Sequence, residues 1–143
     1  MRLAIIPALA VLALSACDMP ANPGGSQYLS VNGRRVVPLD TPGTFEVIAG
    51  PGDAGPQFFC AAADYAHRKL GARSTDRVVI TRSAGDSVSY PGTRGVTFTL
   101  MSQQEAPPTS NSLIMNPRQL GESVTVGNGR HMCQYSDRQR SFR

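Results

Sequence analysis

The chain has 143 residues, with 14 Lys and Arg, 10 Asp and Glu and no Trp, which gives a formal net charge of +4. At this length a single domain is expected. Outside the first sixteen residues, Gly and Pro make up about 19% of the chain and apolar residues about 35%, a composition that excludes a helical bundle, a coiled coil and a polytopic membrane protein but fits a small domain with one modest core.

The N-terminal segment has the pattern of an export signal. Arg2 precedes an almost unbroken apolar run from Leu3 to Leu14, with only Pro7 inside it. Twelve residues are too few to cross a bilayer as a helix, but they match the apolar region of a secretory signal peptide.

The run ends in Leu14-Ser15-Ala16-Cys17, which resembles the lipobox of bacterial lipoproteins. This resemblance covers residues 1–17 and implies cleavage after Ala16, a diacylglycerol thioether on Cys17 and an acyl group such as palmitate on the new amine. The alternative is an ordinary signal peptide that leaves Cys17 as a spare thiol. Asp18 resembles the inner-membrane retention signal of enteric bacteria, so we expect a lipid-anchored protein that faces the periplasm, in the inner rather than the outer membrane.

Two cysteines remain once Cys17 is lipidated, and an even pair in an exported chain indicates a disulfide. They are Cys60 and Cys133, and the bond would close a loop of 74 residues. The chain-entropy model assigns roughly 4 kcal/mol to a loop of that size. The alternative is two unpaired, buried thiols.

The mature chain predicts an α+β fold with about six short, mostly antiparallel strands and one main helix packed on the sheet. Tyr28–Val31 and Arg34–Leu39 flank Asn32-Gly33, the favoured pair for a type I′ hairpin turn. Thr44–Ala49 is the third expected strand.

The helix is predicted over Pro56–Leu70, since proline suits its first position and Gly71 suits the position after its end. At 100° per residue, a core stripe is expected at Phe59, Ala63, Ala66 and Leu70. Phe58 and Tyr65 are expected to pack beside it.

Two further strands and a last hairpin are expected after the helix. Arg77–Arg82 is a near-continuous apolar run, and Gly95–Met101 alternates between apolar and polar residues. Ser123–Val126, the turn Gly127-Asn128-Gly129 and Arg130–Tyr135 predict the hairpin.

These elements divide the chain into four parts. Residues 1–16 form the signal peptide, 17–27 the lipidated cysteine and a flexible tether, 28–135 a single globular domain and 136–143 a flexible basic tail. The last 26 residues carry five Arg against two acids. Such an end favours contact with anionic lipid or cell-wall polymers, although a solvated tail is the simpler interpretation.

One constellation could carry chemistry. On the helix, Asp64 and His67 lie on the same edge as Cys60, and on the expected last strand His131 and Tyr135 share a face with Cys133. The disulfide would draw these faces together, so that Asp64, His67 and His131 could bind a metal or act as a general base. The simpler interpretation is that His67 packs, Asp64 pairs with Arg68 and His131 faces solvent.

No motif for catalysis, metal binding or phosphate binding occurs in the sequence, and no cofactor is expected. The leading hypothesis is a non-enzymatic binding or structural module that contacts the membrane through its anchor and acts on another envelope protein, with no role for nucleic acid. The alternative is a ligand- or metal-binding protein or weak hydrolase that uses His67, Asp64 and His131.

Overall fold

The computed structural model describes residues 26–108 and 115–140. Within them lie six strands and two helices, in the order β1 Tyr28–Leu29, β2 Arg35–Pro38, β3 Thr44–Ile48, α1 Gly55–Leu70, β4 Arg77–Asp86, β5 Arg94–Met101, β6 Ser123–Thr125 and α2 Val126–Arg140. The predicted α+β class is therefore confirmed. The predicted signal peptide, Cys17 and most of the predicted tether lie outside the described residues.

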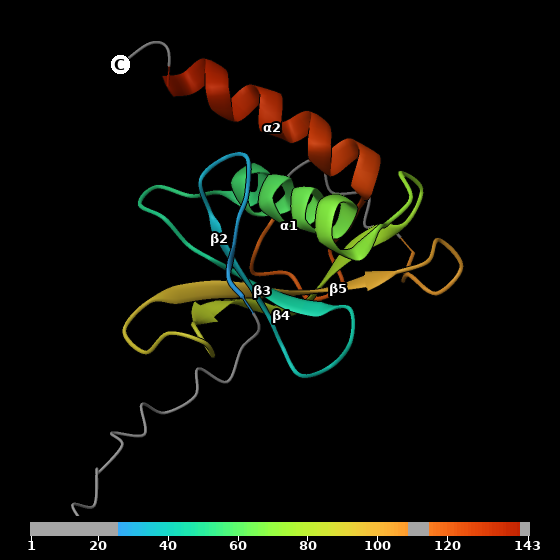
Figure 1. Cartoon of the computed structure of the whole chain (residues 1–143), viewed down its shortest axis with the longest axis horizontal. Coiled ribbons are helices and arrows are strands. Elements are labelled where there is room, and N and C mark those ends of the chain that lie inside the picture. Colours follow the sequence, from blue (N-terminus) through green and yellow to red (C-terminus); the bar gives the residue numbers. More distant parts are fainter. Residues whose placement is uncertain (1–25, 109–114, 141–143) are drawn as a thin grey trace, which may run out of the picture.

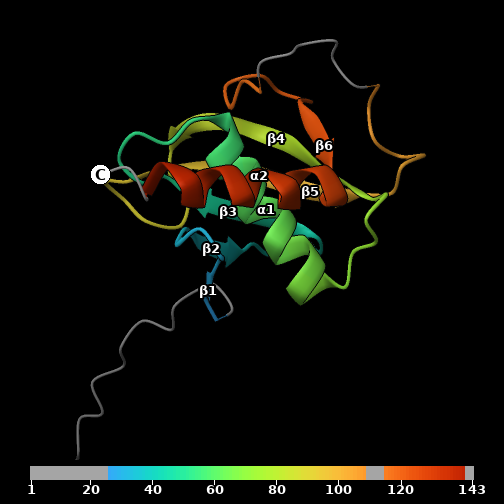
Figure 2. The same cartoon turned by 90° about the horizontal axis from the view of Figure 1, so that it is seen from above.

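All six strands form one antiparallel sheet in the order β1-β2-β3-β5-β4-β6. The chain leaves β3, crosses one face of the sheet as α1 and returns in β4, and β5 then inserts between the two. Figures 1 and 2 show three layers, in which α1 lies between the sheet and α2.

The first hairpin is present, but its turn differs from the prediction. Gly33 has φ of 77°, whereas Asn32 does not have positive φ, so the turn is not type I′. The Gly33 amide donates to the Ser30 carbonyl and the Ser30 amide donates to the Arg34 carbonyl. This pattern fits a type I turn followed by a glycine bulge.

Helix α1 is buried on two sides, which a single core stripe did not predict. Phe59, Ala63 and Ala66 are fully buried as expected, and Phe58 and Tyr65 are buried beside them. The Phe59 ring meets the Phe98 ring edge-on, with centroids 5.3 Å apart. The expectation for Leu70 is wrong, because this residue ends the helix and is 37% exposed.

The inner face of the sheet completes the core beneath α1. Its buried side chains alternate along β2, β3, β5 and β4, as the period of a strand requires. They are Val36, Phe45, Val47, Val96, Phe98, Val78 and Ile80.

The predicted last hairpin is wrong: only β6 is a strand, and the chain then forms α2. Thr125 Oγ1 accepts a hydrogen bond from the Asn128 amide at 3.2 Å, as an N-cap residue does. The amides of Val126 and Gly127 donate to the carbonyls of Asp76 and Ser74. The first amides of α2 therefore have partners, and the helix runs on through Arg140, where a flexible tail from residue 136 was expected.

One of the two glycines that suggested a turn, Gly129, instead allows α2 to approach α1. A Cβ atom at Gly129 would lie 2.5 Å from the Cβ of Ala63 and 2.9 Å from the carbonyl oxygen of Phe59. One turn further on, Cys133 forms a disulfide with Cys60, with Cα atoms 5.0 Å apart. The expected cysteine pair is thus present, but it joins two helices rather than a helix and a strand.

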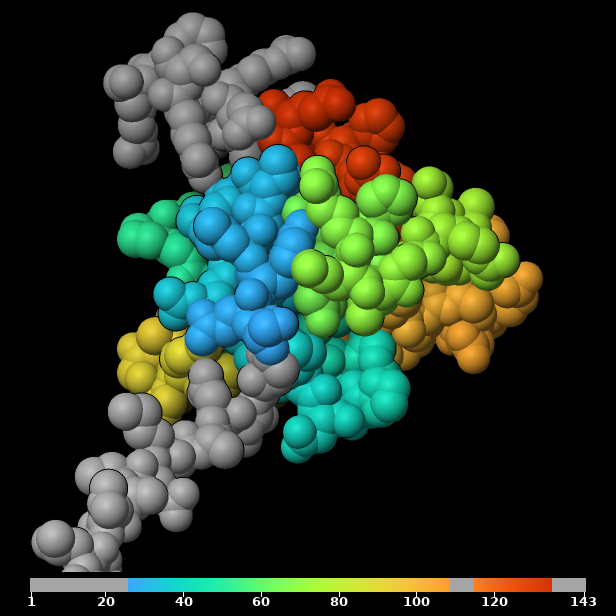
Figure 3. Space-filling view, in the orientation of Figure 1, coloured from blue at the N-terminus to red at the C-terminus, as the bar shows by residue number. Residues whose placement is uncertain are grey.

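The β1–β2 segment, the end of α1 and part of α2 lie on one face of the molecule. Figure 3 shows the blue β1–β2 segment beside the light green end of α1, with α2 above them. Tyr28 connects the first two, because its hydroxyl donates to Asp64 at 2.7 Å.

Candidate binding groove

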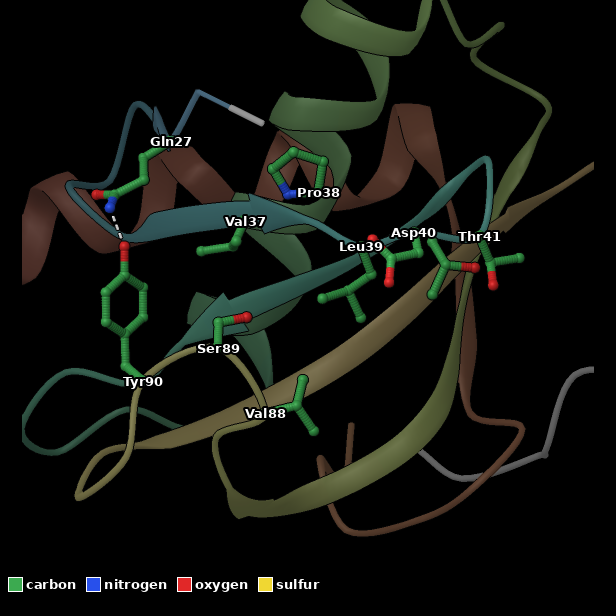
Figure 4. A pocket seen from close by; sticks show the side chains of 10 residues that line it. Gln27, Val37, Pro38, Leu39, Asp40, Thr41, Val88, Ser89 and Tyr90 are labelled. Carbon is green, nitrogen blue, oxygen red and sulfur yellow. Dashed lines mark hydrogen bonds between the residues drawn. The ribbon is translucent and has the colours of Figure 1, made fainter. Parts of the chain in front are cut away.

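A groove lies on the outer face of the sheet, the face that α1 leaves open. It has a volume of about 430 Å³ and runs between the edge formed by β2 and β3 and the loop that joins β4 to β5 (Figure 4). Its lining residues are Gln27, Val37, Pro38, Leu39, Asp40, Thr41, Thr44, Val88, Ser89 and Tyr90. This volume lies within the range of small ligand-binding pockets.

A buried carboxylate holds the loop that forms one wall of the groove. Glu46 of β3 is 1% exposed and accepts hydrogen bonds from Ser87 Oγ at 2.9 Å and from the amides of Val88 at 2.9 Å and Ser89 at 3.0 Å. A Cβ atom at Gly95 would lie 2.5 Å from Glu46 Oε1. The glycine therefore leaves the space in which the carboxylate reaches the loop.

The floor of the groove is apolar, and its wall carries a hydroxyl without a partner. Val37 is 5% exposed, whereas Val88 is 51% exposed at the rim. Ser89 Oγ is buried and has no hydrogen-bond partner among the described residues. Because a buried polar atom without a partner costs free energy, this hydroxyl favours a ligand that brings its own donor or acceptor.

One end of the groove is fixed by an aromatic ring. The guanidinium of Arg35 lies 5.2 Å from the ring centroid of Tyr90, and the Gln27 amide donates a hydrogen bond to the Tyr90 hydroxyl. Gln27, which was assigned to the flexible tether, is therefore bound to the domain. The chain thus enters the described fold beside the groove.

The free part of β2 beside the groove is a poor template for an added strand. β1 pairs only with Val36 and Arg35. The Leu39 amide bonds to β3, so the alternation of strand hydrogen bonds directs Pro38 away from β3, and proline has no N–H to donate. A ligand in this groove is therefore not expected to extend the sheet as a further strand.

The sequence did not point to this groove. The strand predicted over Arg77–Arg82 continues through Asp86 as β4, and residues of the loop that follows it line the groove. The lining residues come from three separate segments and share no periodic pattern. Glu46 is the one signal: an acid within an apolar strand must find donors when it is buried.

Asp64, one of the predicted site residues, is fully engaged in structural bonds. Its carboxylate is 3% exposed and accepts from Tyr28 Oη at 2.7 Å, the Val31 amide at 2.9 Å and Arg68 Nε at 2.8 Å. Burial, together with the hydrogen bond to Asp64, raises the pKa of Tyr28 to about 12. The expected pairing of Asp64 with Arg68 is confirmed.

The other two predicted site residues do not complete a centre. Asp64 and His131 both line a second cleft, of about 370 Å³, between α1 and α2, but His67 is not among the residues that line it. His67 Nδ1 lies 3.4 Å from the Ala72 carbonyl oxygen instead. Within residues 26–108 and 115–140, no three His, Cys, Asp or Glu side chains are arranged to hold a metal ion.

The two histidines do not meet because residues 130–135 were predicted as a strand and belong to helix α2. The face shared by His131 and Cys133 was derived from the two-residue period of a strand. In a helix, side chains two positions apart point in directions about 200° apart. The disulfide therefore brings Cys133 to α1 without bringing His131 to His67.

The chain was compared with known proteins. No protein-family model, no curated protein sequence and no solved structure matches it. In the part of the chain that the structure describes, neither helix is long and apolar enough to span a bilayer.

Proposed function

We propose that the chain is a small lipid-anchored protein of the bacterial envelope, facing the periplasm and acting by non-covalent binding to another envelope protein. The export part rests on Leu14–Cys17, which resembles a lipobox. The bond between Cys60 and Cys133 supports it independently, since structural disulfides persist in oxidising compartments.

The groove is the observation that supports a binding role. Its apolar floor at Val37 and Leu39 suits an apolar side chain of a partner, and the unpartnered Ser89 Oγ suits a backbone amide or carbonyl beside that side chain. The ligand that offers both groups in alternation is a segment of polypeptide. Since the tether joins the fold at Gln27, the groove lies close to the membrane, where other envelope proteins are anchored.

The anchor is tested by changing Cys17. Cys17→Ser should leave the protein unprocessed or released from membranes and should abolish its labelling by palmitate, because acylation needs the thiol. Cys133→Ser is the matched control and should keep both properties. A Cys17→Ser protein that is processed and still membrane-bound would contradict the lipid anchor. Separating the inner and outer membranes of the same cells tests the expectation from Asp18.

The groove is tested by crosslinking in intact envelopes. A photoreactive side chain at Val88, 51% exposed at the rim, should form an adduct with one protein, whereas the same group at Leu120, 63% exposed near the opposite edge of the sheet, should not. Leu39→Arg fills the groove and should remove the adduct. Equal labelling from both positions, or an adduct that survives Leu39→Arg, would refute the groove as the binding site.

A further inference from the structure

The edge of the sheet at β1 carries apolar side chains that the core does not use. Leu29 is 69% exposed and Val31, in the turn after β1, is 52% exposed. They are two of the five large apolar side chains that are exposed in the described part of the chain, and a third, Leu70, ends α1. Since Val31 also lines the cleft between α1 and α2, the apolar edge is continuous with that cleft.

Cationic side chains surround this apolar edge. Lys69, the one lysine of the chain, lies with its Nζ 5.6 Å from the ring centroid of Tyr28. Arg68 remains 58% exposed although its Nε bonds to Asp64. Arg130 is exposed and lines the same cleft as Arg68 and Val31.

Asp64, the one acidic residue that lines this cleft, is occupied by bonds within the protein. Asp64 is buried and satisfied by its three donors. Among the residues that line the cleft, Arg68 and Arg130 are the formal cations and Asp64 is the formal anion. The exposed charge of this surface is therefore positive, and it fits an anionic partner.

The tether places this surface near a bilayer. The chain enters the described fold at Ser26, two residues before β1. Eight residues lie between Cys17 and Ser26, so the chain between these two positions spans about 30 Å at most when fully extended. Lipid at Cys17 would thus hold the β1 edge within reach of the headgroups.

We propose that β1, its following turn, the end of α1 and the start of α2 form a docking surface for anionic phospholipid. Leu29 and Val31 enter the interface, and Arg68, Lys69 and Arg130 contact headgroup phosphates. The proposal rests on the lipid anchor proposed above and adds an orientation to it. Apolar insertion combined with cationic contacts is the usual mode by which peripheral proteins hold anionic membranes.

The absence of tryptophan in the chain makes a direct test available. Val31→Trp introduces a single fluorophore into the docking surface, and Leu120→Trp introduces one at an exposed site near the opposite sheet edge. The full lipidated protein is reconstituted in vesicles of phosphatidylglycerol or phosphatidylcholine that contain brominated acyl chains. Bromine quenches a fluorophore only when the ring enters the acyl region.

The expected result is strong quenching and a blue-shifted emission for Val31→Trp in phosphatidylglycerol vesicles, with little change for Leu120→Trp. Adding Lys69→Gln and Arg130→Gln to the Val31→Trp protein should weaken docking about fivefold for each charge. Both replaced side chains are exposed, so the circular dichroism and thermal melting of the protein should not change.

Three outcomes would overturn the proposal. They are equal quenching of the two reporters, equal quenching in neutral and anionic vesicles, and lipid-independent burial of the Val31→Trp reporter that rises with protein concentration, which would assign the surface to contact between two copies. Mass analysis of Cys17 in the same samples separates this test from that of the anchor. Lipidated protein without quenching refutes docking alone, and quenching without lipidation refutes the anchor alone.

Discussion

The two helices of this protein are stabilised in different ways. In α1, ten of the residues from Gly55 to Ala66 are buried. The helix lies between the sheet and α2. In α2 the buried residues of the described side chains are fewer, and they are Val126, Gly129 and Met132. α1 is held by extensive apolar burial, whereas α2 adds to its few buried side chains one close contact at Gly129 and one covalent bond at Cys133. Helices of similar length can therefore contribute very differently to the core.

The largest expected effect tests the apolar half of this comparison. Phe59→Ala should lower the free energy of unfolding by about 3–5 kcal/mol, because it removes a fully buried ring that contacts Phe98. Leu70→Ala is the control, since that side chain lies at the exposed helix end, and it should cost under about 1 kcal/mol. Urea unfolding measures both, and equal costs would mean that α1 packs in another orientation.

The second effect tests the covalent half. Replacing both Cys60 and Cys133 by Ala should cost about 2–5 kcal/mol. The bond joins α2 to α1, which the sheet also holds. Its removal should therefore loosen α2 first, so that amides of α2 exchange faster than those of α1. Hydrogen exchange measured by mass spectrometry resolves the two helices, and uniform acceleration along the chain would contradict the comparison.

The third effect tests the close contact between the helices. Gly129→Ala should cost about 1–3 kcal/mol, because the new Cβ overlaps Ala63 and the Phe59 backbone. At Gly127 the nearest atom to a new Cβ is the Ser74 carbonyl oxygen at 3.3 Å. Gly127→Ala should therefore be nearly neutral, since its tighter contact is offset by a gain in helix propensity of up to about 1 kcal/mol. Thermal melting of the two variants compares them, and an equal loss would refute close packing at Gly129.

The smallest effect concerns the hydrogen bond by which Tyr28 of β1 contacts Asp64 of α1. Tyr28→Phe should cost about 0.5–1.5 kcal/mol at neutral pH, because the hydrogen bond to the Asp64 carboxylate is lost and water partly replaces it at this half-buried ring. In the folded protein the pKa of Tyr28 is raised to about 12, above its ordinary value of 10.0. This contribution to stability is complete below pH 10 and is lost as the pH rises towards 12. The alkaline loss of stability should therefore be shallower in Tyr28→Phe than in the unmodified protein, as urea midpoints at pH 9 and 11 would show.

Local signals explain which parts of the fold were predictable. Pro56 and Gly71 mark the ends of α1, and the alternation in Gly95–Met101 identifies β5. The cysteine pair was predicted by counting, because the expected lipidation of Cys17 would leave two thiols. Each of these signals is contained in a short segment or in the composition, so no knowledge of the tertiary structure was needed.

The rest depends on contacts between distant segments. Gly127-Asn128-Gly129 is a strong local signal for a turn, and only the position of Ala63 and Phe59 across the interface shows that Gly129 is a contact between two helices. Thr125 as an N-cap was the local signal that favoured a helix. The groove likewise depends on two residues of different strands. Glu46 binds the loop between β4 and β5, and Gly95 leaves the space for its carboxylate.

The position of the disulfide also determines what a protease can release. Cys60 and Cys133 enclose β4, β5, β6 and the start of α2. A single cut anywhere between these cysteines leaves two fragments that are still one covalent molecule, so the C-terminal fragment remains attached to the N-terminal fragment and to whatever anchors it. Such a nicked protein would run as one band on a non-reducing gel and as two after reduction. Release of α2 by a cut within this loop would require a reductant as well as a protease.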